Sequence, residues 1–437
     1  AGDGNIIFGD GLENYIDKKI ENNTFDLLVA NPPYSVSSFK RHLQIKNNTF
    51  ELLDKISNTG GEIEVLFVER IAQLLKPKGL AAVVLPSTIL TNNRPESYVG
   101  AREQILKNFI IRAIVQLGKQ TFGATGTSTI VLFLEKYNEP PKYASMLLDS
   151  VNSILSSSKI SNRADLDLLE SYLGKISSSI ELFEKLKNGT MTIEDSKNDQ
   201  HFSVYDNSFY DSSAYKNLIK SKKYNSLTQE EKNKSKNDLF IKFIKDIEAE
   251  KILYFALSYN QETVVINAPS DNKEEKNFLG YEWSDRKGNE GIKIFNPGGK
   301  LYKNDDRDAI DTLASLIRSS FNNKFEDISE SNSKYASVIN LCDMMDFDRD
   351  YFDKSIKTSV TKKAIKINSI YPLKMIQEIV SIIESGSRPE GGVAHIEEGA
   401  LSLGGEHIDN TSGYLNLDSP KYVPLEFYND STKGKVK

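Results

Sequence analysis

Four adjacent residues place a side-chain amide, two proline rings and a phenol at the end of an apolar run. Asn31, Pro32, Pro33 and Tyr34 follow directly on the predominantly apolar stretch Phe25–Ala30. The two prolines restrict the backbone and remove two amide donors. The Asn31 side chain and the Pro32 carbonyl therefore become fixed hydrogen-bond acceptors that are suited to holding an amino group.

Acceptors of this kind suit the transfer of a methyl group to an aromatic amine. Such an amine is a poor nucleophile because its lone pair is delocalised into the ring. Two acceptors that hold its hydrogens would favour the tetrahedral nitrogen of the transition state. Tyr34 would offer a stacking face to a base rotated out of a duplex. The competing interpretation is a strand that ends in a proline turn with a surface tyrosine; any one of the residues fits it, but the complete tetrapeptide favours chemistry.

The elements around this motif are those of an α/β sheet, because short apolar runs alternate with amphipathic stretches over the first 140 residues. Strands are predicted over residues 5–8, Phe25–Ala30, 79–85, 110–116 and 129–134. Helices are predicted over residues 62–75 and Glu96–Asn108, and residues 76–79 have the composition of a helix C-terminus. In open α/β sheets the loops at the carboxyl ends of strands form the ligand crevice, which is where Asn31 would lie.

Beyond this sheet the composition indicates two further segments. Residues 149–365 are predicted to be a mostly helical extension or linker, with helices over 239–257 and 308–321 and a strand over 263–267. A new unit is predicted over residues 366–437, starting with a helix over 371–384. Residues 1–148 would then be the C-terminal part of a catalytic domain.

Composition narrows the class of protein without identifying it. The 437 residues are enough for several domains, and the single cysteine, Cys342, excludes an internal disulfide and a cysteine-rich zinc site. Cysteine usage is that of a reducing cytoplasm, and no apolar run approaches the roughly 20 residues of a membrane helix. A net charge of −6 argues against nonspecific coating of nucleic acid, but leaves local basic patches open.

Four motifs in order carry a resemblance to a known family: residues 8–12, 31–34, 74–86 and 120–129. Together they resemble the adenine-N6 DNA methyltransferases of restriction-modification systems, in particular the modification subunits of Type I systems and the fused Type IIG enzymes. The resemblance implies a partial doubly wound, Rossmann-like methyltransferase sheet. It also implies S-adenosylmethionine as the cofactor and methyl transfer to a flipped adenine in double-stranded DNA.

The same resemblance assigns roles to individual residues. Asn31, Pro32, Pro33 and Tyr34 are the expected catalytic residues. Asp10 and Asn31 are the expected cofactor-binding residues, and Tyr34 and Phe122 would hold the target base. Lys40 and Arg41 are candidate phosphate contacts. The alternatives are ordinary packing: Asp10 as a helix cap, Phe122 as a core or loop aromatic, and solvated cations at Lys40 and Arg41.

One part of the family pattern does not occur. The family holds the methionine part of its cofactor with a glycine-rich turn after its first strand, and no Asp-Pro-x-x-Gly-x-Gly-like sequence is found in the 437 residues. The expectation is therefore that the chain starts at the third strand of the fold. By itself it would bind S-adenosylmethionine weakly and be inactive.

The C-terminal segment resembles the start of the α/β target-recognition domain of Type I specificity subunits, over residues 385–393 and 401–408. Arg388 is a candidate DNA contact, since arginine is the most frequent specific reader of guanine edges. A solvent-exposed turn arginine is the alternative. His395 and His407, with the neighbouring glutamates, match no zinc template, so no metal site is predicted.

The resulting prediction is a cytoplasmic, site-specific adenine-N6 DNA methyltransferase with specificity and restriction subunits as partners and no membrane association. Two alternatives stay open. One is a methyltransferase acting on RNA or on a protein glutamine, which shares the chemistry of a planar nitrogen. The other is a noncatalytic DNA-binding or assembly piece of a larger complex. Cofactor titration separates the second from the enzymes, and methylation assays on DNA, RNA and protein separate the substrates.

Overall fold

The computed structural model describes residues 6–118, 121, 128–156, 159–160, 162–284, 291–295, 298–325, 328, 330–358, 389, 396–404, 407, 415 and 417–429. The chain divides into two compact units, Ala1–Thr361 and Lys362–Lys437. Within the described residues, no helix combines the length and the apolar composition needed to cross a membrane.

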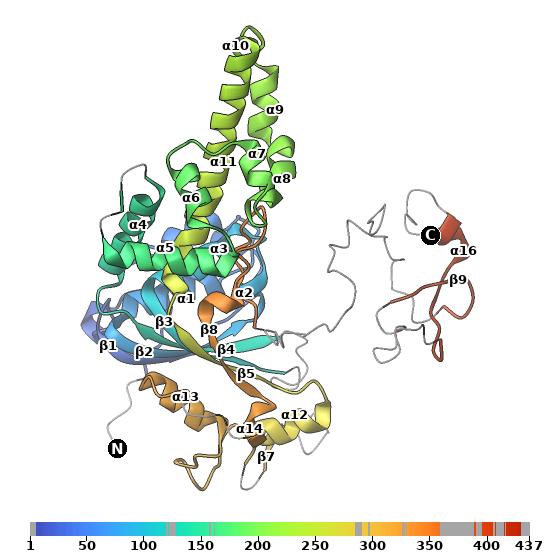
Figure 1. The fold of residues 1–437 in the computed structure, drawn as a ribbon. Helices are drawn as coiled ribbons and strands as arrows, with labels where there is room; N and C mark the ends of the chain where they lie inside the picture. Colours follow the sequence, from blue (N-terminus) through green and yellow to red (C-terminus); the bar gives the residue numbers. More distant parts are fainter. Residues whose placement is uncertain are drawn as a thin grey trace. The chain divides into compact units, whose positions relative to one another are not determined.

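A six-stranded sheet forms the centre of the first unit (Figure 1). Its strands, in the order in which they pair, are β1 (Phe25–Ala30), β2 (Leu75–Pro86), β4 (Thr129–Lys136), β3 (Phe109–Gln116), β5 (Glu262–Asn267) and β8 (Ala336–Asn340). The pairs β1–β2 and β3–β5 are parallel, whereas β4 and β8 run antiparallel to their neighbours. The mixed α/β class expected from the sequence is confirmed, and β1, β2, β3 and β5 share one direction.

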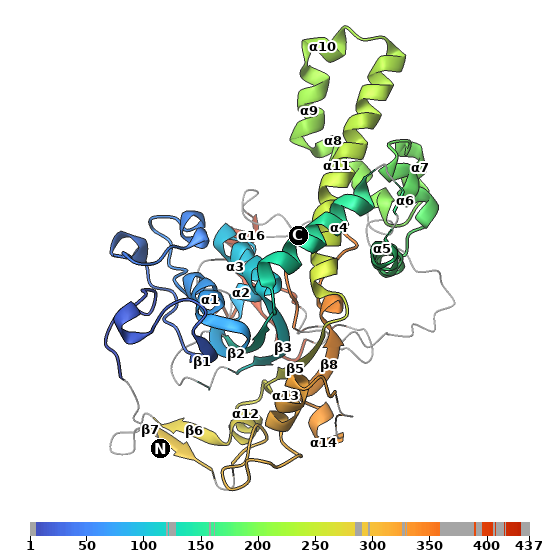
Figure 2. The ribbon, with the colours of Figure 1, turned by 90° about the vertical axis from the view of Figure 1, so that its left-hand side faces the viewer.

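Helices cover both faces of this sheet (Figures 1 and 2). On one face lie α1 (Glu64–Leu74), α2 (Thr88–Thr91) and α3 (Glu96–Asn108). On the other lie α12 (Asn272–Leu279) and α13 (Leu313–Phe321). Two separate apolar clusters result, because side chains of β3 point to opposite faces: Ala113 and Val115 enter one cluster and Ile114 enters the other. Ile111 joins Ile114 because the register shifts between Ile111 and Ala113.

Two local predictions need correction. Residues 6–8, which the apolar run predicted to be a strand, form none: Ile6 and Phe8 are fully exposed, and the segment has no ladder partner among the described residues. A short apolar run becomes a strand only where another strand satisfies its backbone groups. Residues 76–79 belong to the irregular start of β2 instead of a helix end, since α1 already ends at Leu74. Lys78 there takes a φ of 62°, and a Cβ at Gly79 would lie 2.9 Å from the Lys76 carbonyl oxygen.

Residues 149–365, for which the sequence predicts a mostly helical extension, contain helices and also contribute β5 and β8 to the central sheet. The α-helices between β4 and β5 are α4 (Pro140–Leu155), α5 (Arg163–Ile176), α6 (Ile180–Lys187), α7 (Ile193–Lys197), α8 (Tyr205–Asp211), α9 (Ser213–Lys220), α10 (Lys222–Asn225) and α11 (Gln229–Ser258). The C-terminal half of α11 packs near α3 and α4, whereas its N-terminal half forms a hairpin with α9 and α10 that extends away from the sheet (Figures 1 and 2).

A buried polar network joins α5, α8 and α11. The Glu248 carboxylate is fully buried and accepts hydrogen bonds from Tyr172 Oη at 2.7 Å, from His201 Nε2 at 2.9 Å and from Tyr205 Oη. The Lys251 ammonium lies 3.4 Å away. Burial by itself would raise the pKa of Glu248, but His201, Lys251 and Tyr205 outweigh it and hold that pKa at about 2.

Little of the second unit is described. It contains an antiparallel pair, β9 (Ala400–Leu401) with β10 (Tyr422–Val423), and a short helix, α16 (Leu425–Asn429). The helix predicted over residues 371–384 lies outside the described residues, as does Arg388.

Candidate functional site

The Asn31-Pro32-Pro33-Tyr34 motif lies at the carboxyl end of β1. Because β1, β2, β3 and β5 point the same way, the loops that follow them leave the sheet at one edge. At this edge the Ser87 amide after β2 donates to the Ser128 carbonyl at 2.9 Å, and the Leu117 amide after β3 donates to the Thr129 carbonyl at 2.9 Å. The motif therefore occupies the side of the sheet where a ligand crevice is expected.

The four side chains of the motif differ in their exposure to solvent. Pro32 is buried and anchors the loop, Asn31 and Pro33 are exposed, and Tyr34 is half-buried. In the part of the chain that the structure describes, the Asn31 amide forms no hydrogen bond. Both its oxygen and its nitrogen are free to bind a ligand from the crevice.

Three backbone hydrogen bonds hold the turn that follows Tyr34. Ser35 takes a φ of 59°, and its amide donates to Glu64 Oε2 at 3.3 Å. The Val36 amide donates to the Gly61 carbonyl at 3.0 Å, and the Ser38 amide donates to the Gly60 carbonyl at 3.1 Å. The loop is thus tied to the N-terminal end of α1 at three successive points.

Glu64 is the buried centre of this support. Its side chain is fully buried, and Tyr98 from α3 donates its hydroxyl to Glu64 Oε1 at 2.7 Å. Burial raises the pKa of Glu64, although its hydrogen bonds partly offset the effect. Burial and the neighbouring Glu64 also raise the pKa of Tyr98. Two helices therefore fix the backbone immediately after the proposed stacking residue Tyr34.

Sequence reasoning missed Glu64 and Tyr98. A glutamate at the first position of a helix is ordinarily explained by the helix dipole, and a tyrosine in an amphipathic helix by packing. Glu64 follows Ser35 by 29 residues and precedes Tyr98 by 34. The sequence signal for this support is the pair Gly60-Gly61 just before α1. Because glycines have no side chain, their carbonyls can accept hydrogen bonds from a second chain segment.

Arg102 fixes the neighbouring loop, which follows β2. Its guanidinium is fully buried and donates to the Ile89 carbonyl at 2.8 Å, the Asn92 carbonyl at 2.9 Å and Asn93 Oδ1 at 2.5 Å. Its Nε also donates to the Lys354 carbonyl at 2.7 Å. One buried side chain therefore fixes the loop after β2 by three hydrogen bonds.

Asp10, the expected cofactor residue, lies in a tight turn. Its Oδ1 accepts a hydrogen bond from the Leu12 amide at 2.9 Å, and its own amide donates to Tyr15 Oη at 2.7 Å. The residue is exposed, and its second carboxylate oxygen has no partner within the described residues. Asp10 has a local structural function and keeps one oxygen available for a ligand.

The two cations after the motif differ in availability. The Lys40 ammonium donates to the Leu53 carbonyl at 2.8 Å and to the Ile56 carbonyl at 2.9 Å, so two of its three hydrogens are engaged within the chain. Arg41 is exposed and forms no ion pair in the described part of the chain. Phe122, expected to hold the base, lies outside the described residues.

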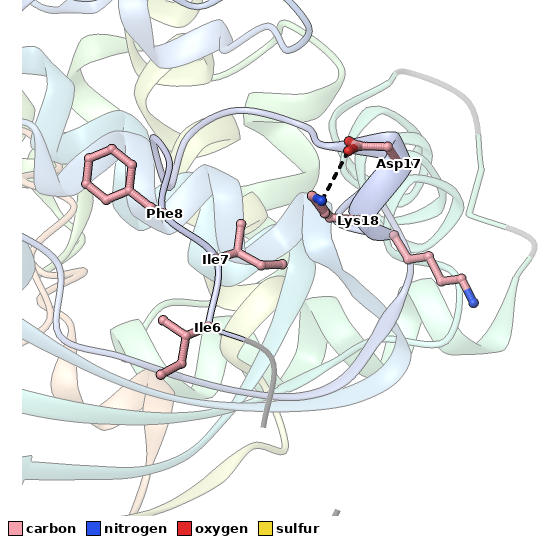
Figure 3. Close-up of a pocket in the computed structure, with 6 residues that line it drawn as sticks. Ile6, Ile7, Phe8, Asp17 and Lys18 are labelled. Atoms are coloured by element: carbon pink, nitrogen blue, oxygen red, sulfur yellow. Dashed lines mark ion pairs between the residues drawn. The ribbon is translucent and has the colours of Figure 1, made fainter. Parts of the chain in front are cut away.

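A surface hollow of about 500 Å³ lies beside the segment before Asp10 (Figure 3). It is lined by Ile6, Ile7, Phe8, Asp17, Lys18 and Lys19. Asp17 and Lys18 form an ion pair of 3.6 Å at its rim. Three apolar side chains next to charged groups can accommodate a ligand that has both apolar and polar parts.

Among the described residues, no group of three histidine, cysteine or acidic side chains is placed to bind a metal ion. His407 is buried, and its Nδ1 accepts a hydrogen bond from the Gly404 amide at 2.9 Å, which is a local structural contact.

Comparisons with known proteins address the N-terminal part of the chain. Residues 2–168 match the model of the N-6 DNA methylase family. The Type II restriction enzyme and methyltransferase RM.Eco57I of Escherichia coli is 28% identical over 150 residues, covering 31% of this chain and 15% of that protein. The methylase subunit of the Type I restriction enzyme MpnII of Mycoplasma pneumoniae is 26% identical over 163 residues, covering 36% of this chain and 29% of that one.

Among solved structures, the M protein of the Type I restriction enzyme EcoKI is similar at 22% identity, with a TM-score of 0.23, over 29% of this chain and 23% of that one. The chain spans less than a third of the length of each curated relative named above. The resemblance to the methyltransferases of restriction-modification systems is confirmed, and it lies in residues 2–168, which are similar to the N-6 DNA methylase family.

Proposed function

We propose that this chain carries the catalytic loop of a site-specific adenine-N6 DNA methyltransferase. The observation that supports the proposal best is the placement of residues 31–34 at the carboxyl edge of β1, within the region that matches the N-6 DNA methylase family. Among the described residues the Asn31 amide has no hydrogen-bond partner, while the backbone after Tyr34 is held by three hydrogen bonds.

In the proposed reaction the loop acts on the amino group of an extruded adenine. The Asn31 side-chain oxygen and the Pro32 carbonyl accept hydrogen bonds from the two amine hydrogens. These bonds favour the tetrahedral nitrogen of the transition state, and therefore lower the barrier instead of only binding the ground state. Tyr34 stacks on the base and keeps it out of the duplex.

Two residues that precede β1 in the sequence fit part of S-adenosylmethionine. The free carboxylate oxygen of Asp10 would accept a hydrogen bond from the cofactor's adenine amine, and the exposed ring of Phe8 offers an apolar face next to it. When bound, the cofactor supplies an electrophilic methyl group. We expect the 437 residues alone to bind it weakly, because they contain no glycine-rich turn for its methionine part; calorimetry on the chain tests this.

The partners follow from the same proposal. One relative is named as the methylase subunit of a Type I restriction enzyme. We therefore propose specificity and restriction subunits as partners and double-stranded DNA as the substrate. Within the second unit, a DNA-recognition function for residues 366–437, including Arg388, remains part of the proposal.

The experiment is a methyl-transfer assay on the complete protein with radiolabelled cofactor and duplex DNA, RNA or protein as acceptor. Label in DNA, located on N6 of adenine by nuclease digestion and mass spectrometry, is the expected result. Label in RNA or on glutamine instead of DNA would replace the proposal by one of the alternatives. Cofactor binding without transfer to any acceptor would contradict the catalytic function.

A further inference from the structure

A helical hairpin outside the catalytic region carries a concentrated positive charge. We define the basic hairpin as residues 212–245, which include α9, α10 and the N-terminal half of α11. It contains nine lysines and three acidic residues, and hence a charge of +6 in a chain whose net charge is −6. The lysines are Lys216, Lys220, Lys222, Lys223, Lys232, Lys234, Lys236, Lys242 and Lys245.

The basic hairpin projects from the helices that support it (Figures 1 and 2). Neither α9 nor α10 contains a buried residue, and α11 contains none before Phe240. Its base is fixed by aromatic contacts, with Phe209 lying 5.1 Å from Tyr215 and 5.0 Å from Phe240 between ring centroids. The hairpin is therefore an ordered arm with nearly all of its tip surface open.

The lysines near the base and those near the tip have different environments. Lys216 pairs with Asp211 at 3.5 Å, Lys236 lies 4.9 Å from the centroid of the Tyr210 ring, and Lys245 donates to the Lys187 carbonyl at 2.8 Å. Contacts within the chain therefore explain the positions of these three lysines, and no binding partner is needed for them.

At the tip, four lysines are exposed and form no hydrogen bond or ion pair, and every residue of the hairpin is described. They are Lys220, Lys222, Lys223 and Lys234. The carboxylates of the hairpin do not balance its lysines: Glu231 is held in a capping box with Thr228, and the remaining two, Glu230 and Asp238, are exposed and form no ion pair within the described residues. Such a cluster repels itself unless an anion neutralises it.

Isolated surface lysines are usually only solvated, and three features favour a partner here. The cluster is confined to one arm, the remainder of the chain is acidic, and the arm has no pocket-forming core that would select a small anion. An open row of lysines on a rigid helical pair fits an extended polyanion. Lysine binds phosphates as a point charge and does not select a base sequence.

We propose that the basic hairpin binds the phosphate backbone of double-stranded DNA and helps to hold the duplex that the catalytic loop modifies. The proposal rests on the proposed function, because that function supplies DNA as the substrate. It assigns the hairpin to affinity and leaves sequence choice and chemistry to other parts of the protein.

Salt dependence of binding gives the most direct test. Each lysine–phosphate contact contributes about 0.9 to the slope of log affinity against log salt concentration for duplex DNA. Replacing Lys220, Lys222, Lys223 and Lys234 together by glutamine should therefore reduce the magnitude of that slope by about 3–4. Fluorescence anisotropy of the complete protein with a labelled duplex, from low to moderate salt, measures the slope.

Two matched variants serve as controls. The first replaces four other exposed lysines, Lys78, Lys159, Lys273 and Lys324, by glutamine, so that net charge changes equally away from the hairpin. The second replaces the four hairpin lysines by arginine, which preserves charge. Thermal unfolding of each variant checks that the fold is retained.

The proposal predicts a reduced slope and weaker binding for the hairpin glutamine variant alone, on duplexes with or without the methylation site. Equal slopes for the hairpin and control glutamine variants would overturn it. The proposal would also be overturned if the hairpin glutamine variant lost affinity for duplex RNA but kept its affinity for duplex DNA. Failure of the proposed function is distinguishable, since it would appear as absent methyl transfer to DNA while the difference in slopes persists.

Discussion

Glu64 gives the sharpest test of how the catalytic loop is positioned. Replacing Glu64 with alanine removes the acceptor of the Ser35 amide and of the Tyr98 hydroxyl. The side chain is fully buried, so water does not readily replace the lost bonds. Each buried donor left without a partner costs about 1–3 kcal/mol.

The effect on catalysis should come from displacement of Tyr34 and Asn31. A shift of about 1 Å in a positioned group can cost about 100-fold in rate. We expect Glu64→Ala to lower kcat by about that factor with a smaller change in KM. Glu64→Gln should retain most activity, because its amide oxygen can accept from Ser35 and its amide nitrogen can donate to Tyr98.

Single-turnover methyl transfer by the complete protein measures these rates, and urea unfolding measures the accompanying change in stability. A fluorescent adenine analogue at the target position reports whether the base is still stacked. The reasoning is refuted if Glu64→Ala transfers methyl groups at the wild-type rate, or if the alanine and glutamine variants lose activity equally.

Four further predictions concern the buried Glu248, the stacking of Tyr34 on the base and the segment 366–437. Glu248→Ala should lower the free energy of unfolding by about 3–5 kcal/mol, since it leaves the buried charge of Lys251 uncompensated; chemical denaturation checks this. Because the pKa of Glu248 is lowered to about 2 in the folded protein, its stabilisation is fully present above its ordinary pKa near 4.5 and is lost as the pH falls through about 2; acid titration should show that loss in the wild type and not in Glu248→Gln. Tyr34→Ala should weaken capture of a fluorescent base analogue by about 1–3 kcal/mol, and Tyr34→Phe should not; equal signals would count against stacking. Exchanging residues 366–437 for the equivalent segment of a relative should change the methylated sequence, as measured by mapping modified adenines; an unchanged site would contradict a recognition function for that segment.

Elements specified by local pattern could be predicted from the sequence. The strand Phe25–Ala30 and the helix Glu96–Asn108 have the predicted bounds, because apolar spacing, a following proline and a polar last turn are all local signals. The α/β class followed from the same alternation.

Features that depend on contacts between distant segments could not be predicted. The apolar residues 6–8 have a strand-like composition, but pairing decides whether a strand forms. The two hydrogen bonds from the Lys40 ammonium to the Leu53 and Ile56 carbonyls likewise join segments that no local pattern relates. The support from Glu64 and Tyr98 depends on two helices meeting behind one loop, which no local pattern specifies.

The central claim is that Asn31 holds the reacting amine. Asn31→Ala in the complete protein should remove at least about 3 kcal/mol of transition-state stabilisation, comparable to the loss of one oxyanion-hole donor. Pre-steady-state methyl transfer to a duplex with the target adenine measures this loss, with DNA affinity measured in parallel by anisotropy. We expect a rate lowered by at least about 100-fold with affinity nearly unchanged; a near-normal rate of methyl transfer would contradict this function of Asn31.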